Sequence, residues 1–323
     1  MFLGIEIGGT KLQLGVGRGD GVLAGLRRET VDPCQGAEGI RRQIVQAVPE
    51  LLERAKLDRS VLRGVGIGFG GPVDDATRTV IKSHQIEGWD NFPLADWIGD
   101  LVGLPAALGN DADVAGLAEA LFGAGKGLSP IFYITIGSGI GGGLIINGEI
   151  YRGCGRGAAE IGHLLVNASA LPGPPGFLHC VVEQVASGWG IERVARAWAG
   201  NDSLAETLLV KSVRGQVGDI TARHVADAAI RGDEFALQIL LYAWNNLAQA
   251  VGQVIKLVCP KRIIIGGGVS QMGEALLFKH LRPMVRAHLD FAPFADCWDI
   301  VPAALGEEVV VHGALALAKA RLG

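Results

Sequence analysis

Gly4-Ile5-Glu6-Ile7-Gly8-Gly9-Thr10-Lys11 stands almost at the start of the chain and does most to decide its fold. An apolar run ends in this glycine pair, and a second apolar run with period 2 begins at Leu12. Two short strands around such a pair predict a β-hairpin with its turn at Gly8-Gly9. Glycines let backbone N–H groups approach a ligand, and the following threonine and lysine add a hydroxyl and a cation, which suits a phosphate. Taken alone, the segment is explained as well by an ordinary hairpin turn.

A second stretch, Gly137-Ser138-Gly139-Ile140-Gly141-Gly142-Gly143, repeats the pattern of strand, glycine turn and strand. It does not match the dinucleotide fingerprint, because no helix follows the glycines directly. Lys126, which also lies among glycines, lacks the spacing and the following hydroxyl of a Walker A loop. Two phosphate-type hairpins, each opening its own strand-rich region, predict two related lobes that face one nucleotide.

Three further segments accompany the hairpins: Asn110-Asp111, Glu160-Ile161-Gly162-His163 and Ile264-Ile265-Gly266-Gly267-Gly268-Val269-Ser270. With the hairpins, and in this order, they resemble the motifs of the ROK sugar kinases, within the actin/hexokinase-like ATPase superfamily. In that family the first pair carries the catalytic Asp, the second segment is the sugar-binding E-x-G-H element, and the third lies on the adenosine side. The resemblance covers nearly all of the chain.

The resemblance implies an α/β fold of the two-lobed, actin-like ATPase (ribonuclease H-like) class, with a cleft between the lobes. We expect a small N-terminal lobe of residues 1–122, completed by the C-terminal helix 307–323, and a large lobe of residues 123–306. A chain of 323 residues is long enough for two separate cores. A homodimer is the family expectation.

The resemblance also assigns roles to individual residues. Asp111 is expected to be the general base, although a carboxylate where a helix begins can also be its N-cap, and Asp113 is a rival carboxylate two residues on. Sugar contacts are expected from residues that donate and accept hydrogen bonds or form a backbone wall, namely Gly71, Asn110, Asp111, Glu160, His163 and Glu183. ATP contacts are expected from Gly8, Gly9, Thr10, Lys11, Gly137, Ser138, Gly139, Gly267 and Gly268.

The chain departs from the family pattern at several positions. Glu6 stands where most members have an Asp that orients Mg²⁺ through water; Glu keeps the charge, and some fructokinase-like relatives resemble the chain here. Ser138 keeps the hydroxyl of the usual Thr. The zinc motif found in many members is replaced by a proline-rich stretch (172–183) in which only His179 and Cys180 could bind metal. Since a structural zinc site needs four ligands, we expect no zinc.

Composition excludes several classes of protein. Hydrophobic residues make up 49% of the chain and charged residues 19%, which is typical of a globular protein. A net charge of −4 argues against a nucleic-acid surface. Neither a membrane-length apolar run nor a signal-peptide pattern is present, so a cytoplasmic protein is expected. The five scattered cysteines suggest reduced, buried thiols. The 49 glycines, about twice the usual share, are expected in turns and loops.

Hydrophobic periodicity predicts where regular elements lie. Strands are expected at 2–7, 12–17, 21–28, 64–69, 105–109, 131–136 and 262–265. Helices are expected at 37–57, 94–103, 111–122, 183–198, 221–231, 233–258, 273–289 and 307–321.

Several functions remain open at this point. The first hypothesis is an ATP- and Mg²⁺-dependent hexokinase, most simply a glucokinase; fructose, mannose and N-acetylated amino sugars are alternative substrates. A sugar-responsive repressor of the same fold would carry a helix-turn-helix domain before the first phosphate motif, which here begins at residue 4. A non-catalytic sugar sensor is disfavoured because Lys11, Asp111 and His163 are retained.

Overall fold

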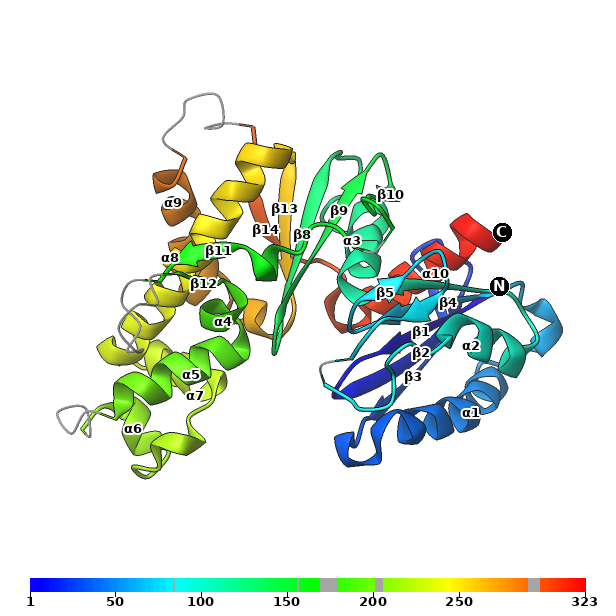
Figure 1. Ribbon diagram of the computed structural model, residues 1–323, viewed down its shortest axis with the longest axis horizontal. Helices are drawn as coiled ribbons and strands as arrows, with labels where there is room; N and C mark the ends of the chain where they lie inside the picture. Colours follow the sequence, from blue (N-terminus) through cyan, green and yellow to red (C-terminus); the bar gives the residue numbers. More distant parts are fainter. Residues whose placement is uncertain (84, 156, 169–178, 201–205, 290–296) are drawn as a thin grey trace. The chain divides into compact units, whose positions relative to one another are not determined.

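The computed structural model describes residues 1–83, 85–155, 157–168, 179–200, 206–289 and 297–323 (Figure 1). These residues form two compact units. Unit 1 comprises Met1–Tyr133, Gly143–Ala159 and Ala303–Gly323, and unit 2 comprises Ile134–Gly142 and Glu160–Pro302. The boundaries between the units therefore fall within the two strands that flank the second glycine turn.

Unit 1 is built on a mixed sheet with the strand order β3-β2-β1-β4-β7. β1 pairs antiparallel with β2 and parallel with β4, and β4 pairs parallel with β7. The strands are β1 (Phe2–Ile7), β2 (Lys11–Gly17), β3 (Leu23–Thr30), β4 (Val65–Phe69) and β7 (Ala106–Asn110), with a small hairpin of β5 (Val73–Asp74) and β6 (Thr79–Val80). The helices are α1 (Gly36–Arg54), α2 (Leu94–Val102), α3 (Asp111–Phe122) and α10 (Val309–Leu322).

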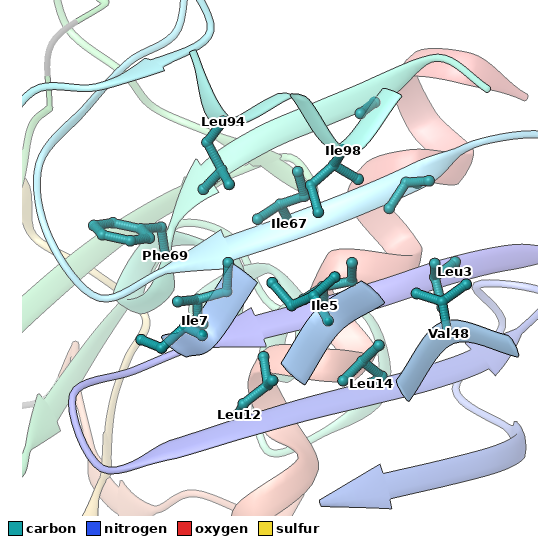
Figure 2. Packing of buried hydrophobic residues seen from close by; sticks show 14 of the residues in the cluster. Leu3, Ile5, Ile7, Leu12, Leu14, Val48, Ile67, Phe69, Leu94 and Ile98 are labelled. Atoms are coloured by element: carbon teal, nitrogen blue, oxygen red, sulfur yellow. The ribbon is translucent and has the colours of Figure 1, made fainter. Parts of the chain in front are cut away.

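One face of this sheet packs against α1 and α2 through large apolar side chains (Figure 2). Alternate residues of a strand share a face, so Leu3, Ile5 and Ile7 of β1 all enter this core. They meet Val48 from α1 and Ile98 from α2. Each such fully buried side chain contributes about 1.5–3 kcal/mol to folding.

The opposite face is rich in glycine, and α10 lies directly on it, also packing against Phe2, Leu23 and Leu26. A Cβ added at Gly66 would lie 1.8 Å from the carbonyl oxygen of Ala314, and one at Gly68 would lie 2.4 Å from Val310. Gly4 and Gly15 meet α10 in the same way. The expectation that the excess glycine serves turns and loops was therefore incomplete, because part of it lets a helix approach the sheet.

The second sheet has the strand order β10-β9-β8-β13-β14. Its strands are β8 (Ile131–Ile136), β9 (Ile140–Ile146), β10 (Glu149–Ile150), β13 (Arg262–Gly266) and β14 (Ile300–Pro302). In each sheet, three strands that are consecutive in sequence lie side by side. Two strands from later in the chain then extend the sheet beyond the first of these three. This shared order supports the duplicated fold that the two hairpins suggested.

In unit 2 the long helix α8 (Glu234–Val258) packs against α4 (Glu183–Ala186), α5 (Gly188–Ala199), α7 (Ala222–Ile230), α9 (Lys279–Ala287) and β11 (Leu165–Asn167). The buried indole of Trp244 on α8 donates a hydrogen bond of 2.7 Å to the carbonyl of Leu276. The unit also contains β12 (His179–Val181) and α6 (Leu208–Ser212).

Most expected elements are confirmed, but four differ. The helix expected at 37–57 ends three residues earlier, at Arg54. The third strand starts and ends two residues later, as β3. The helix expected at 183–198 is two helices, because the Ser187 side chain accepts from the Gly190 N–H at 3.0 Å and starts α5 afresh. The helix expected at 273–289 begins with a π-helical turn at Glu274–Phe278.

Candidate active site

The carboxyl ends of three parallel strands meet at one edge of the unit 1 sheet. Ile7 at the end of β1 is in register with Phe69 at the end of β4, which is in register with Asn110 at the end of β7. Ligands of α/β sheets bind at the carboxyl ends of the strands. The first glycine hairpin, Gly71 and Asp111 all follow directly from this edge.

The turn of the first hairpin is wider than the glycine pair alone. It is closed by a 3.0 Å hydrogen bond from the Gly8 N–H to the Lys11 carbonyl. Neither Gly8 nor Gly9 has a left-handed φ. A Cβ at Gly9 would instead lie 1.7 Å from the Gln85 side-chain oxygen, so this glycine makes room for a neighbouring side chain. Thr10 at the tip is exposed.

Glu6 lies beneath this turn with only 5% of its surface exposed. One carboxylate oxygen forms a 2.9 Å ion pair with Lys11, and the other accepts a 2.7 Å hydrogen bond from Gln13. Burial raises the pKa of Glu6, and the charge of Lys11 acts against that rise. Both oxygens therefore have protein partners, which does not fit direct binding of Mg²⁺ by this carboxylate.

Sequence reasoning missed Gln13, which joins the hairpin to the segment before α10. Its side-chain N–H group donates to the Glu307 carbonyl at 2.9 Å, and Lys11 Nζ donates to the same carbonyl at 3.3 Å. Gln13 stands directly opposite Glu6 in the hairpin register. A glutamine between leucines in an apolar strand, facing a glutamate, was the signal that could have found it.

Asn110, and not Asp111, is the N-cap of α3. The Asn110 side-chain oxygen accepts from the backbone N–H groups of Ala112 and Asp113, at 2.9 and 3.4 Å. Its amide N–H donates to the Gly71 carbonyl at 3.0 Å. The N-cap is therefore Asn110 rather than Asp111, although Asp111 Oδ1 also accepts from the Ala112 N–H at 2.9 Å.

The Asp111 carboxylate lies beside the glycines of the neighbouring strands. A Cβ added at Gly70 would lie 3.5 Å from Asp111 Oδ2 and 3.6 Å from the Gly8 Cα. Asp111 is half-buried, whereas the rival Asp113 is 4% exposed and electrostatically coupled to Arg152. This difference favours Asp111 as the carboxylate that a substrate reaches.

In unit 2, the second hairpin is held by α4 and α5. The Gly188 N–H at the start of α5 donates to the Gly137 carbonyl at 2.8 Å. Glu183 at the start of α4 accepts a 2.7 Å hydrogen bond from the Ile140 N–H. A Cβ at Gly139 would lie 2.5 Å from the Glu183 carboxylate, so a larger residue there would push the end of this side chain away from the hairpin.

The E-x-G-H segment lies against the same hairpin. A Cβ at Gly162 would lie 2.1 Å from the Ile140 carbonyl oxygen, so only glycine permits this contact. Glu160 and His163, on either side of it, both reach solvent. Desolvation by the surrounding protein raises the pKa of Glu160; His163 opposes that rise and the like charge of Glu183 adds to it.

The glycines of the adenosine-side motif divide into two kinds. Gly267 has a φ of +86°, and a Cβ there would lie 2.5 Å from the Ile136 carbonyl oxygen, so the fold requires it. At Gly268 and Gly137, no described atom lies within 4 Å of an added Cβ. The open space at these two glycines is what close approach of a ligand needs.

The structure thus gathers the predicted residues into two sets, one in each unit. Unit 1 contains Glu6, Gly8, Gly9, Thr10, Lys11, Gly71, Asn110 and Asp111, and unit 2 contains Gly137, Ser138, Gly139, Glu160, His163, Glu183, Gly267 and Gly268. Within the described ranges, no cluster of three or more His, Cys, Asp or Glu side chains could hold a metal ion. Residues 172–178 of the stretch expected to lack zinc lie outside the described residues, so that expectation stays a prediction.

Comparison with known proteins identifies the family. A family model described as the ROK family matches residues 2–321. The chain belongs to the ROK family. A glucokinase of Thermotoga maritima is 33% identical to this ROK protein over 323 residues, which cover 100% of the chain and 98% of the relative. A putative fructokinase of Bacillus subtilis is 28% identical over 98% of the chain and 95% of its own length.

A solved structure extends the likeness to the fold. The ROK family glucokinase of Streptomyces griseus, in complex with glucose and AMPPNP, matches this ROK protein with a TM-score of 0.80 and 32% identity over 99% of each chain. The expected two-lobed, actin-like α/β fold is confirmed.

Within the described residues of this ROK protein, no helix has the length and hydropathy needed to cross a membrane.

Proposed function

We propose that the protein transfers the γ-phosphoryl group of ATP to a hexose, and that the hexose is glucose. The observation that carries this proposal is the position of Asp111 at the end of β7, beside Gly70 and the first glycine hairpin. The full-length likeness to proteins named glucokinase supports the choice of sugar.

In this reaction Asp111 accepts the proton of the attacking sugar hydroxyl. A carboxylate within hydrogen-bond reach of that hydroxyl accelerates such transfers by about 10²- to 10⁴-fold. Asn110 fixes its position, because its side chain caps α3 and also holds the Gly71 carbonyl. The protonated carboxyl group then returns its proton to solvent.

The two glycine hairpins bind the phosphates, and Gly267 and Gly268 line the adenosine. Thr10, Lys11 and Ser138 supply polar groups, and open Cβ space at Gly137 and Gly268 admits the nucleotide. Mg²⁺ comes with the nucleotide, because it prefers phosphate oxygens and water as ligands, and it neutralises phosphate charge when bound there. Glu6 would be the residue that orients this Mg²⁺ through water, and Lys11 and Gln13 keep that carboxylate in place.

The sugar is bound by groups that complement its ring of hydroxyls. Glu160, His163 and Glu183 offer acceptors and donors, and Asn110 and the Gly71 backbone complete the set. A site of this kind rejects analogues that lack a hydroxyl, because its own polar groups would lose their partners. We also propose a cytoplasmic homodimer, with the small lobe formed by residues 1–122 and 307–323.

A fructokinase is the second candidate. It is favoured by the putative fructokinase relative and by Glu6 in place of the usual Asp. The sugar used, rather than the presence of kinase activity, distinguishes the two proposals.

The test is a coupled assay of ADP release with Mg-ATP and a panel of glucose, fructose, mannose, N-acetylglucosamine and N-acetylmannosamine. We expect saturable turnover with the highest kcat/KM on glucose, and almost none for Asp111→Asn as the matched negative control. A higher kcat/KM on fructose would support the second candidate. Glucose binding by calorimetry without turnover on any sugar would support a non-catalytic sensor instead.

A further inference from the structure

Two cysteines of unit 2 lie side by side. The sulfur of Cys259 is 3.5 Å from that of Cys297, although 38 positions separate them in sequence. A disulfide bond joins sulfurs about 2.05 Å apart. The two sulfurs therefore need to move about 1.5 Å closer to form a bond. Rotation of the two side chains can supply a movement of this size.

The fold fixes the backbone at Cys259 and at Asp299, two residues after Cys297. Cys259 caps the C-terminus of α8, with a φ of 49° and an N–H that donates to the Ile255 carbonyl at 2.9 Å. Cys297 lies two residues before Asp299, whose carbonyl accepts a 2.8 Å hydrogen bond from the Ile263 N–H. Arg262 also clamps the Asp299 carboxylate, with hydrogen bonds of 2.9 and 2.7 Å.

The two thiols differ in their surroundings. Cys259 is exposed, whereas Cys297 is partly covered, so the expectation of buried thiols was wrong for both. Burial and the hydrogen bond with Cys259 raise the pKa of Cys297. The exposed sulfur is therefore the one that a reagent in solution meets first.

We propose that Cys259 and Cys297 form a redox-active pair, which closes to a reversible disulfide when it meets a low-molecular-weight disulfide. The Cys259 thiolate attacks one sulfur of the reagent, and the first small thiol leaves. Cys297 then loses its proton and attacks the Cys259 sulfur, which releases the second small thiol. Two protein thiols are oxidised by two electrons, and the reagent is reduced to two thiols.

The bond closes a ring that contains β13, α9 and the Gly267-Gly268 segment. A cross-link of this length restricts the unfolded chain and so stabilises the folded one. We therefore expect the oxidised protein to unfold at a temperature several degrees higher than the reduced protein.

The test treats the whole protein with oxidised glutathione at low protein concentration. We expect loss of two of the five thiols, a mass lower by two hydrogen atoms, and a peptide map that links Cys259 to Cys297. Dithiothreitol should restore both thiols, and the unfolding temperature should rise on oxidation and fall on reduction.

Cys259→Ser and Cys297→Ser should each abolish the mass loss and the temperature shift. Cys34→Ser and Cys154→Ser, which change other exposed cysteines, should leave both intact. Because glycine is favoured at a left-handed helix cap, Cys259→Gly is a second variant that keeps the fold. A stable glutathione adduct at Cys259, a bond between two molecules or one to another cysteine, or oxidation without a change in unfolding temperature would overturn the proposal.

Discussion

The carboxylate of Glu183 accepts a 2.7 Å hydrogen bond from the backbone N–H of Ile140, so the residue proposed to bind sugar also anchors the second glycine hairpin. Two functions of one side chain can be separated by substitution, because glutamine keeps an acceptor oxygen but loses the charge, and alanine loses both. The pair of variants shows which property each substrate requires.

We expect Glu183→Gln to raise the KM for the sugar alone, and Glu183→Ala to raise the KM for both sugar and ATP. The loss of a charged acceptor from a backbone N–H costs about 1.5–3 kcal/mol, so the alanine variant should also unfold more readily. Steady-state kinetics with each substrate varied in turn provides the measurement. An unchanged KM for ATP in Glu183→Ala would show that the hairpin does not depend on this hydrogen bond.

Asp111→Asn should lower kcat by about 10²- to 10⁴-fold while glucose binding persists, because the amide cannot accept the proton. Rapid-quench or coupled kinetics gives kcat, and calorimetry gives the dissociation constant. Asp113→Asn is the comparison: it should lower the free energy of unfolding, since partly buried Arg152 would lose a nearby opposite charge, with little effect on kcat per folded molecule. Equal turnover of Asp111→Asn and the wild type would remove Asp111 from the mechanism.

Gly267→Ala should destabilise the protein, and Gly268→Ala should not. An alanine at Gly267 meets the Ile136 backbone and a strained φ, whereas the space around Gly268 is open among the described atoms. Chemical denaturation compares the two variants directly. Because Gly268 is proposed to face the nucleotide, its alanine variant should raise the KM for ATP without a loss of stability. An unchanged KM for ATP would argue against placing Gly268 at the nucleotide.

Glucose binding should weaken in mild acid because of Glu160. Its pKa lies above the ordinary value of 4.5, so the carboxylate gains a proton at a higher pH than a free glutamate does. A protonated carboxyl accepts fewer hydrogen bonds from the sugar, and affinity should fall as pH drops through the raised pKa.

The contribution of Glu160 to folding has the opposite sign. Because its folded pKa is raised, it favours the folded state below its ordinary pKa, and this benefit is lost as pH rises through the folded value. The binding prediction is tested by calorimetric titrations with glucose from about pH 5 to about pH 8. Glu160→Gln should remove most of the pH dependence of glucose affinity. An identical affinity profile in the variant would assign this pH dependence to another group.

Glu119→Ala should lower the free energy of unfolding by at least about 3 kcal/mol. One Glu119 oxygen accepts from the N–H groups of Ala304 and Leu305, each at 2.9 Å, and the other accepts from Ala124 at 2.7 Å. A hydrogen bond to a charged group contributes about 1.5–3 kcal/mol to stability, and the Glu119 side chain that accepts these three bonds is fully buried. Glu53→Ala, at an exposed position of α1, serves as the control and should change little.

Motifs and periodicity predicted the fold class and most elements, because hairpin glycines and long apolar stripes are local signals. Asn110 and Asp111 show the limit of such signals: both residue types cap helices well, and only the structure shows that Asn110 is the cap. No local pattern in the sequence indicates the break between α4 and α5 at Ser187. Apolar spacing runs through it, while the Gly188 contact with Gly137 depends on residues far away in sequence.

The glycine-rich face of the unit 1 sheet has a consequence for how the chain folds during synthesis. Its cover, α10, comes from Val309–Leu322, so the ribosome makes residues 160–302 before that layer exists. Exposed apolar side chains on a waiting intermediate promote aggregation. At Gly4, Gly15, Gly66 and Gly68 the waiting surface offers backbone in place of such side chains. The glycines that admit the last helix thus also limit the hazard of its late arrival.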